Sequence, residues 1–253
     1  MFKFSIRKNR GLLQPIEVHH LRQYLYLMGA VAGNKSYEYG NVTTDDICAD
    51  VLAELVSQSC NLVDKVSNKE VIKRICSDYS EAALLDGRGS GDASWYVLGC
   101  IRMAKLMAFH CNLPLSVSLI KQLLISYGNA FDESVFDEYS ATIQSVLDWY
   151  REQLLNMYKS NESFLRVLAE FHSRFRQATE CVSTACWDVS CILLFRECLV
   201  LGVSPIIIHE DNASDYFSAL GYANNENYDK LVKLLKKEQL TTSEYLRSLR
   251  VVW

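Results

Sequence analysis

The sequence predicts an all-α protein in which roughly ten helices surround one central, buried helix. Apolar residues recur at helical spacing along most of the chain. Only three Pro and eleven Gly leave little material for the many turns of a β-sandwich. The stretch from Cys186 to Leu201 is apolar almost all the way round. Because a helix without a polar face is normally buried, this stretch is the expected centre of the domain.

Local signals at both ends give the bounds of this central helix. Gly202 follows its last residue as a natural C-cap, and Pro205 confirms the stop. Ser183 and Thr184 are candidate N-caps just upstream, and Asp188 lies early enough to favour the positive end of the helix dipole. We therefore expect a helix of about four turns that is entered by a polar loop.

The other predicted helices are amphipathic and would pack around the central one. Two of them begin with the Ser/Thr-x-x-Glu pattern of a capping box, at Ser67 and at Thr241. In chain order, the further helices are expected over Ile16–Ala32, from Thr44, from Ser67 to about Leu85, over Ser94–Phe109, after the turn 112–116, over Val135–Tyr158, from Asn161 through Phe175, and over Asp211–Leu220, Asn225–Lys237 and Thr241–Leu249. Residues 203–208 would form a short extended piece.

We expect two parts in the chain: residues 1–32 as an N-terminal segment and helix, packed on a helical domain with C-terminal helices that spans 33–253. The one Gly-rich stretch is Asp-Gly-Arg-Gly-Ser-Gly-Asp at 86–92. It lacks the following Lys-Ser/Thr and the preceding strand of a phosphate-binding loop, so we expect a flexible linker there. No internal period indicates a repeat array.

Composition argues against several classes of function. The formal charge of −4 disfavours a nucleic-acid partner, which would prefer a basic surface. No stretch reaches the ~18 uninterrupted apolar residues that span a bilayer, and the basic N-terminus lacks the apolar core of a signal peptide. The nine Cys are scattered without the spacing of a zinc site. They indicate reduced, buried thiols in a cytoplasmic compartment and no metal.

Several segments of the chain resemble the Fic/Doc/AvrB (Fido) family in their order and spacing. Tyr39–Ile47 is similar to the family's Glu-Gly-Asn segment and the Thr-led helix that follows it, and Leu201–Ile208 resembles the close of its motif helix. The other matches are Leu147–Tyr150, Glu170–Phe175, and Asp215–Leu220 together with Leu231–Leu235. The resemblance covers about residues 33–238 and implies a Fido-type helical fold.

The catalytic signature of the family is missing. Members that transfer AMP from ATP use a His-Pro-Phe-x-Asp/Glu-Gly-Asn-Gly-Arg-x-x-Arg motif. Its His deprotonates the target hydroxyl, its acid holds a metal, and its amides and Arg grip phosphates. Counting back from Gly202, Glu180 or Thr179 stands at the His position, and Asp188 and Cys191 replace the two Arg. The metal-binding acid and the Gly residues are absent, which implies a Fido-like protein without the AMP-transfer machinery.

The replacements oppose the binding of a triphosphate at this helix N-terminus. Ser183 or Thr184 would cap the free N–H groups that an anion needs, and Trp187 would crowd the approach. Asp188 would reverse the charge, since two unit charges ~4 Å apart interact by about 4 kcal/mol at an effective dielectric near 20. Trp187 is the residue most expected to line any remaining pocket.

Two further parts of the family's machinery are unrecognisable. In many members the Glu of the Glu-Gly-Asn segment pairs with the second Arg and inhibits the enzyme. Tyr39 stands at that position here. The family also carries a β-hairpin flap that docks the target. The link 127–134 is short for such a hairpin, so we expect the flap to be reduced or absent.

These observations leave two functional hypotheses. The leading one is a protein that binds another protein, as a regulator or as a bacterial effector delivered to a host cytosol, and that needs no cofactor. A nucleophilic Cys186 with His172 as its base would be a separate chemistry. The alternative hypothesis is a divergent transferase that uses a nucleotide or nucleotide sugar in a rebuilt cleft. Its catalytic candidates are His172 and Glu180, and its candidates for lining the cleft are Arg176, Ser183, Thr184, Trp187, Asp188 and Tyr39.

Overall fold

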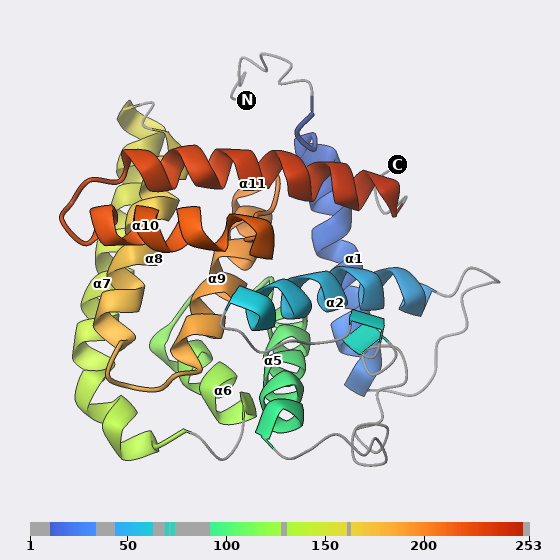
Figure 1. The fold of residues 1–253 in the computed structure, drawn as a ribbon, viewed down its shortest axis with the longest axis horizontal. Helices are drawn as coiled ribbons and strands as arrows, with labels where there is room; N and C mark the ends of the chain where they lie inside the picture. Colours follow the sequence, from blue (N-terminus) through green and yellow to red (C-terminus); the bar gives the residue numbers. More distant parts are fainter. Residues whose placement is uncertain are drawn as a thin grey trace.

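The chain forms an array of helices, with no strand in the part that the structure describes (Figure 1). The structure, a computed structural model, describes residues 11–33, 44–62, 69–70, 72–73, 92–127, 131–160 and 163–249. Nine α-helices and one short 3-10 helix lie within these ranges. The predicted all-α fold class is therefore confirmed. Of the helices described, none is both long enough and apolar enough to cross a membrane.

The elements follow the predicted order, with shifted ends. They are α1 (Pro15–Gly33), α2 (Thr44–Leu62), α5 (Asp92–Phe109), α6 (Val117–Tyr127), α7 (Glu133–Ser160), α8 (Phe164–Thr179), α9 (Cys186–Leu201), η1 (Glu210–Asn212), α10 (Ala213–Ala223) and α11 (Asp229–Ser248). Helix α8 begins three residues after Asn161, with Ser163 at its N-cap position. The predicted helix from Ser67 and the linker 86–92 fall largely outside the described residues.

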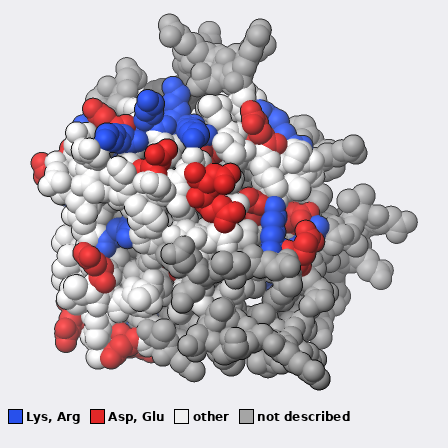
Figure 2. All heavy atoms as spheres, in the orientation of Figure 1, with Lys and Arg blue, Asp and Glu red and all other residues white. Residues whose placement is uncertain are grey.

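Helices α10 and α11 pack on each other and lie across α8 (Figure 1). Their inward side is apolar, and Tyr216, Ala219 and Leu220 of α10 are buried. Their outward side is charged (Figure 2). Its exposed members are the lysines of α11 and the acidic residues around the start of α10, namely Lys230, Lys233, Lys236, Lys237, Glu210, Asp211 and Asp215.

Helix α9 is the centre of the fold, with the bounds that the sequence predicts. Thirteen of its sixteen residues are buried, and it packs against α1, α2, α5, α6 and α8. At its end Gly202 adopts a φ of 69°. The Gly202 N–H then donates to the Leu199 carbonyl (3.2 Å) and the Val203 N–H to the Cys198 carbonyl (3.0 Å). This pattern is a Schellman C-cap, which explains why a glycine stands there.

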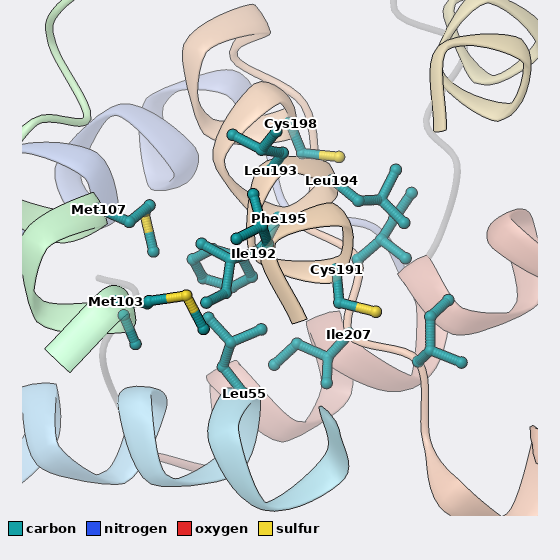
Figure 3. Close-up of a cluster of buried hydrophobic side chains, with 14 of the residues drawn as sticks. Leu55, Met103, Met107, Cys191, Ile192, Leu193, Leu194, Phe195, Cys198 and Ile207 are labelled. Carbon is teal, nitrogen blue, oxygen red and sulfur yellow. The ribbon is translucent and has the colours of Figure 1, made fainter. Parts of the chain in front are cut away.

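Apolar side chains from several helices meet around α9 (Figure 3). Ile192 and Phe195 of α9 lie against Met103 and Met107 of α5, and Leu55 of α2 closes the cluster from another side. All of them are at most 2% exposed. Because each such burial stabilises the fold by roughly 1.5–3 kcal/mol, this cluster fixes the position of α9 and of the loop that precedes it.

The predicted division of the last helix at Thr241 is wrong, because α11 runs without a break to Ser248. The two threonines serve other partners. Thr242 is fully buried, and its Oγ1 accepts a hydrogen bond from the Ile207 N–H (3.0 Å). The Thr241 hydroxyl donates to the Lys237 carbonyl one turn back (3.4 Å). Neither side chain is available to cap a new helix, so the capping-box pattern has no effect here.

Candidate functional site

The candidate site is the connection between α8 and α9, residues 180–185, with the side chains that flank it. Its backbone is tightly turned. The Val182 N–H donates to the Thr179 carbonyl (3.0 Å), the Cys186 N–H to the Ser183 carbonyl (3.0 Å) and the Trp187 N–H to the Thr184 carbonyl (3.2 Å). Two amides at the start of α9 are therefore already occupied by the loop itself.

The predicted side-chain capping of α9 by Ser183 or Thr184 is wrong. The N-cap residue is Ala185, and it makes no side-chain cap bond. The Ser183 hydroxyl oxygen instead accepts a hydrogen bond from the Ala185 N–H (3.2 Å). The chain makes one more turn before the helix than the sequence pattern indicates, so backbone carbonyls take the role expected of the two hydroxyls. An anion would still find these N–H groups occupied, because an N–H group that already donates to a carbonyl cannot also bind a phosphate.

Asp188 does not face the loop, in contrast to its expected role as a charge that repels phosphates. It is fully buried between α9, α2 and α5. The Ser59 hydroxyl donates to its Oδ1 (2.6 Å), and the Tyr96 hydroxyl donates to its Oδ2 (2.7 Å). Burial raises the pKa of Asp188 to about 6, although these hydrogen bonds oppose the shift. The residue thus anchors the start of α9 in the core.

His172 lies on α8 and is fully buried against α10. Its Nε2 is 2.6 Å from the Tyr216 hydroxyl oxygen. Burial, together with the positive charge of Arg176, lowers the pKa of His172 to about 3. The ring is neutral at physiological pH, and its Nε2 is engaged by a residue that ties α8 to α10.

Three side chains from three helices stack beside the loop. The guanidinium carbon of Arg176 lies 3.4 Å from the centroid of the Trp187 ring, and Trp187 stacks on Phe217 with centroids 5.0 Å apart and planes 27° apart. Arg176 and Trp187 are half-buried, whereas Phe217 is 44% exposed. Tyr216 also packs edge-on against Trp187, with ring centroids 5.5 Å apart. We call Arg176, Trp187 and Phe217 the aromatic stack.

The stack leaves two donors without an acceptor. Arg176 Nη1 and Trp187 Nε1 are both buried, and neither has a hydrogen-bond partner among the described residues. A cation over a tryptophan face contributes up to about 2 kcal/mol when it is desolvated, which offsets part of that cost. The stack is thus a rigid platform that ends in an exposed phenylalanine ring.

The remaining candidates do not converge on one point. Glu180 and Thr184 are exposed on the loop, and Ser183 is half-buried. Tyr39 lies outside the described residues. The structure brings His172, Arg176 and Trp187 together with Tyr216 and Phe217 of α10, and it places Asp188 in a separate network. Tyr216 and Phe217 were not expected as site residues, although both lie within a segment that resembles the family.

The cysteines near the site lack the character of nucleophiles. Burial raises the pKa of the Cys186 thiol to about 11 and that of the Cys191 thiol to about 12. A thiol of that kind stays protonated at neutral pH, and the nucleophile is the thiolate. His172, the base considered for Cys186, is bonded to Tyr216. Among the residues that the structure describes, no group of three His, Cys, Asp or Glu is arranged to hold a metal ion.

Comparison with known proteins identifies the fold. No family model matches the sequence, and no curated protein matches it. Twelve chains of solved structures do match. One is the crystal structure of a Fic domain containing signaling protein from Bacteroides thetaiotaomicron, with a TM-score of 0.61 and 13% sequence identity over 92% of this chain and 98% of that chain. The chain has the fold of a Fic domain.

This result confirms the Fido-type fold that the resemblance of ordered segments implies. The α8–α9 connection is the stretch where the family resemblance implies the AMP-transfer signature to stand, and the motif does not occur in the sequence there. Helix α9 corresponds to the predicted motif helix and keeps its closing glycine. Two predictions about the rest of the family's machinery are not tested, because Tyr39 and residues 128–130 of the expected flap link lie outside the described part of the chain.

Proposed function

We propose that this Fic-fold chain has lost AMP transfer and acts by binding another protein, as a regulator or an effector in a cytosolic compartment. The observation that carries the proposal is the use of the polar groups around the α8–α9 connection. His172 is bonded to Tyr216, and Asp188 is bonded to Ser59 and Tyr96. The Nε2 of His172 and both carboxylate oxygens of Asp188 are therefore engaged within the core, which supports the loss of a transfer reaction.

The start of α9 supports the same conclusion. A phosphate-binding helix terminus needs free N–H groups and room for close approach. Here the Cys186 and Trp187 amides donate to loop carbonyls, and the Trp187 ring is held between Arg176 and Phe217. These contacts support the proposal that the start of α9 does not bind a phosphate.

The aromatic stack is the surface that we assign to the protein partner. Phe217 is 44% exposed, and its position is fixed by Trp187 beneath it. Aromatic and arginine side chains dominate binding hot spots, and a ring that is already immobile loses little entropy on binding. The stack combines both properties next to a loop whose Glu180 and Thr184 are exposed.

A panel of nucleotides and nucleotide sugars, with and without magnesium, tests the loss of transfer. A ligand at 100 times its dissociation constant adds ~2.7 kcal/mol, which for a chain of this size raises the melting temperature by roughly 5–10 °C. We expect no shift with any donor. A saturable shift that Trp187→Ala abolishes would overturn the proposal and favour a divergent transferase with a rebuilt cleft.

Site-specific cross-linking tests the partner surface. A photoactivatable residue in place of the exposed Ser218 lies next to Phe217 on α10. In cells that express the chain, we expect one discrete adduct that Phe217→Ala removes. Tyr222→Ala is the matched control, because Tyr222 is also 44% exposed on α10 but stacks on no other aromatic ring among those described. An adduct that survives Phe217→Ala, or no adduct at all, contradicts this surface.

A further inference from the structure

A polar cluster that the proposed function does not use lies where α2, η1 and α11 meet. Its centre is His209, the residue just before η1, whose side chain is 14% exposed. Two buried carboxylates flank the ring, Glu54 of α2 and Glu238 of α11. A buried carboxylate is costly unless a cation or hydrogen-bond donors compensate it, so the partners of these groups decide what the cluster does. We call these three residues the acid–histidine cluster.

One ring nitrogen of His209, Nδ1, carries a proton. It lies 2.6 Å from Glu238 Oε2, and an ionised carboxylate only accepts hydrogen bonds. The other oxygen of Glu238, Oε1, accepts a hydrogen bond from Asn212 Nδ2 (2.7 Å). Both oxygens of this fully buried carboxylate are therefore engaged, and the imidazole ring is held in one orientation.

The second ring nitrogen, Nε2, faces the second carboxylate. It lies 3.7 Å from Glu54 Oε1, which also accepts a hydrogen bond from Gln58 Nε2 (2.9 Å). In the neutral ring Nε2 holds a lone pair, so two acceptors face each other without a proton between them. When Nε2 gains a proton, the same contact becomes an attraction between an imidazolium and a carboxylate. The proton on His209 thus sets the sign of this contact with α2.

The same proton decides the charge balance of the cluster. Lys69 forms an ion pair with Glu54, whereas no Lys or Arg among the described residues pairs with Glu238. Lys237, next to Glu238 in the chain, instead donates to Asn212 Oδ1 (2.6 Å). A neutral ring leaves two carboxylates with one ammonium group, and a protonated ring supplies the missing positive charge. The other charged or titratable residues around the cluster are the Asp50–Lys73 ion pair, Tyr245 against Lys69, and the exposed Glu210 and Asp211.

We propose that His209 acts as a pH-sensitive latch between α11 and α2. In acid a proton on Nε2 completes a bridge of carboxylate, imidazolium and carboxylate from Glu238 to Glu54. As pH rises through the range in which histidine loses its charge, solvent takes this proton and the Glu54 half of the bridge is lost. The Glu238 half remains, because Nδ1 keeps its proton in both states.

The latch controls how η1 is held against α2. The Glu210 N–H donates to Gln58 Oε1 (2.8 Å), and the amide of the same Gln58 donates to Glu54. Loss of the Glu54 contact therefore acts on the residue that also holds the backbone of η1. Helix α10 begins at Ala213, directly after η1, so the latch fixes the point at which α10 starts.

Hydrogen–deuterium exchange of the full chain tests the latch. The wild type is compared with His209→Gln at the same pH, so that intrinsic exchange rates and the titration of Asp188 cancel. At about pH 5.5 the amides of residues 209–213 should exchange roughly fivefold or more slowly in the wild type than in the variant. At about pH 8 the two rates should agree within about twofold, because the neutral ring makes no ion pair. His19→Gln, which removes an exposed histidine of α1, is the matched control and should behave as the wild type does.

A second substitution separates the latch from a purely structural role of His209. Glu54→Gln keeps the shape of the side chain but removes the charge that faces Nε2. In that background His209→Gln should change the exchange rates by the same factor at both pH values. A pH-dependent factor that persists in the Glu54→Gln background would contradict the bridge.

Nitrogen-15 NMR of the imidazole ring of the wild type reads the proton state directly and does not depend on any variant. We expect a protonated Nδ1 and a bare Nε2 at about pH 8, and two protonated nitrogens at about pH 5.5. A ring that carries the same charge at both pH values would overturn the proposal. So would an exchange ratio between the wild type and His209→Gln that does not change with pH.

Discussion

The two halves of α9 bury polar groups in different ways. In the first half the partners of Asp188 in the described part of the chain are neutral, chiefly the hydroxyls of Ser59 and Tyr96. In the second half Arg196 and Glu197, at most 3% exposed, form an ion pair on the helix itself. Tyr150 donates to Glu197 Oε2 (3.0 Å), and Arg196 also donates to the Leu113 carbonyl.

The difference shows that the two ends of α9 are anchored by different kinds of contact. The ion pair ties α9 to α7 and to the turn before α6, so the second half is a structural clamp. The first half adjoins the α8–α9 connection, and there a carboxylate without a cation is held in the core. Burial raises the pKa of both acids, and the nearby Arg196 opposes that shift only at Glu197. Changes at Glu197 and Asp188 test this comparison, and changes at Tyr216 and Phe217 extend it to the contacts that α10 makes beside the connection.

The largest expected effect is the loss of the clamp. Glu197→Ala leaves Arg196 buried without its carboxylate, which costs about 3–5 kcal/mol in the free energy of unfolding. Urea unfolding followed by circular dichroism measures the change. Glu197→Gln is the control, because an amide keeps the shape and accepts the Tyr150 hydrogen bond, so it is expected to cost less. A loss below about 1 kcal/mol for Glu197→Ala would contradict the role of the clamp.

The next largest effect is the change of stability with pH that Asp188 causes. Its pKa is 3.8 in the unfolded reference and about 6 in the folded chain. Between these values the folded state binds more protons, so the free energy of unfolding falls as pH rises from about 4 to about 6. The contribution of Asp188 to that fall is about 3 kcal/mol, and Asp188→Asn removes it. The free energies of unfolding of the wild type and of Asp188→Asn, measured at pH 4 and at pH 7, give this contribution. The prediction would be refuted if the two proteins differed by the same amount at both pH values.

Tyr216→Phe probes the contact between α10 and α8. The change removes the hydroxyl that lies 2.6 Å from His172 Nε2 and leaves a buried ring nitrogen without that partner. We expect a loss of about 1–3 kcal/mol in the free energy of unfolding. Tyr222→Phe, on the exposed side of α10, should stay within about 0.5 kcal/mol of the wild type. Equal effects of the two changes would mean that the Tyr216 hydroxyl contributes nothing.

The smallest expected effect concerns the aromatic stack. Phe217→Ala removes a stacked aromatic pair worth about 0.5–1.5 kcal/mol, and Tyr222→Ala removes an equally exposed ring that stacks on no other ring in the described part of the chain. Thermal unfolding compares the two variants. The stack is therefore expected to matter more for partner binding than for stability. A loss well above 2 kcal/mol for Phe217→Ala would instead make it a core contact.

The sequence located the central helix well because local signals define it. The apolar run from Cys186 to Leu201 and the following Gly202 are short-range features, and both act through the backbone of the helix itself. The division of α11 at Thr241 was wrong for the opposite reason. The pattern is local, but Thr242 is bonded to Ile207, thirty-five positions away in the chain.

In the candidate site, long-range contacts limit what local sequence patterns can predict even more. The all-α fold and the central place of α9 follow from the sequence by itself, because they depend on residue identity and helical periodicity. Which way each side chain points was decided by the tertiary structure. The hydrogen-bond partners of Asp188 lie 129 and 92 positions away, and Trp187 stacks on a ring from α10. Such contacts form only when the helices pack, and no local pattern encodes them.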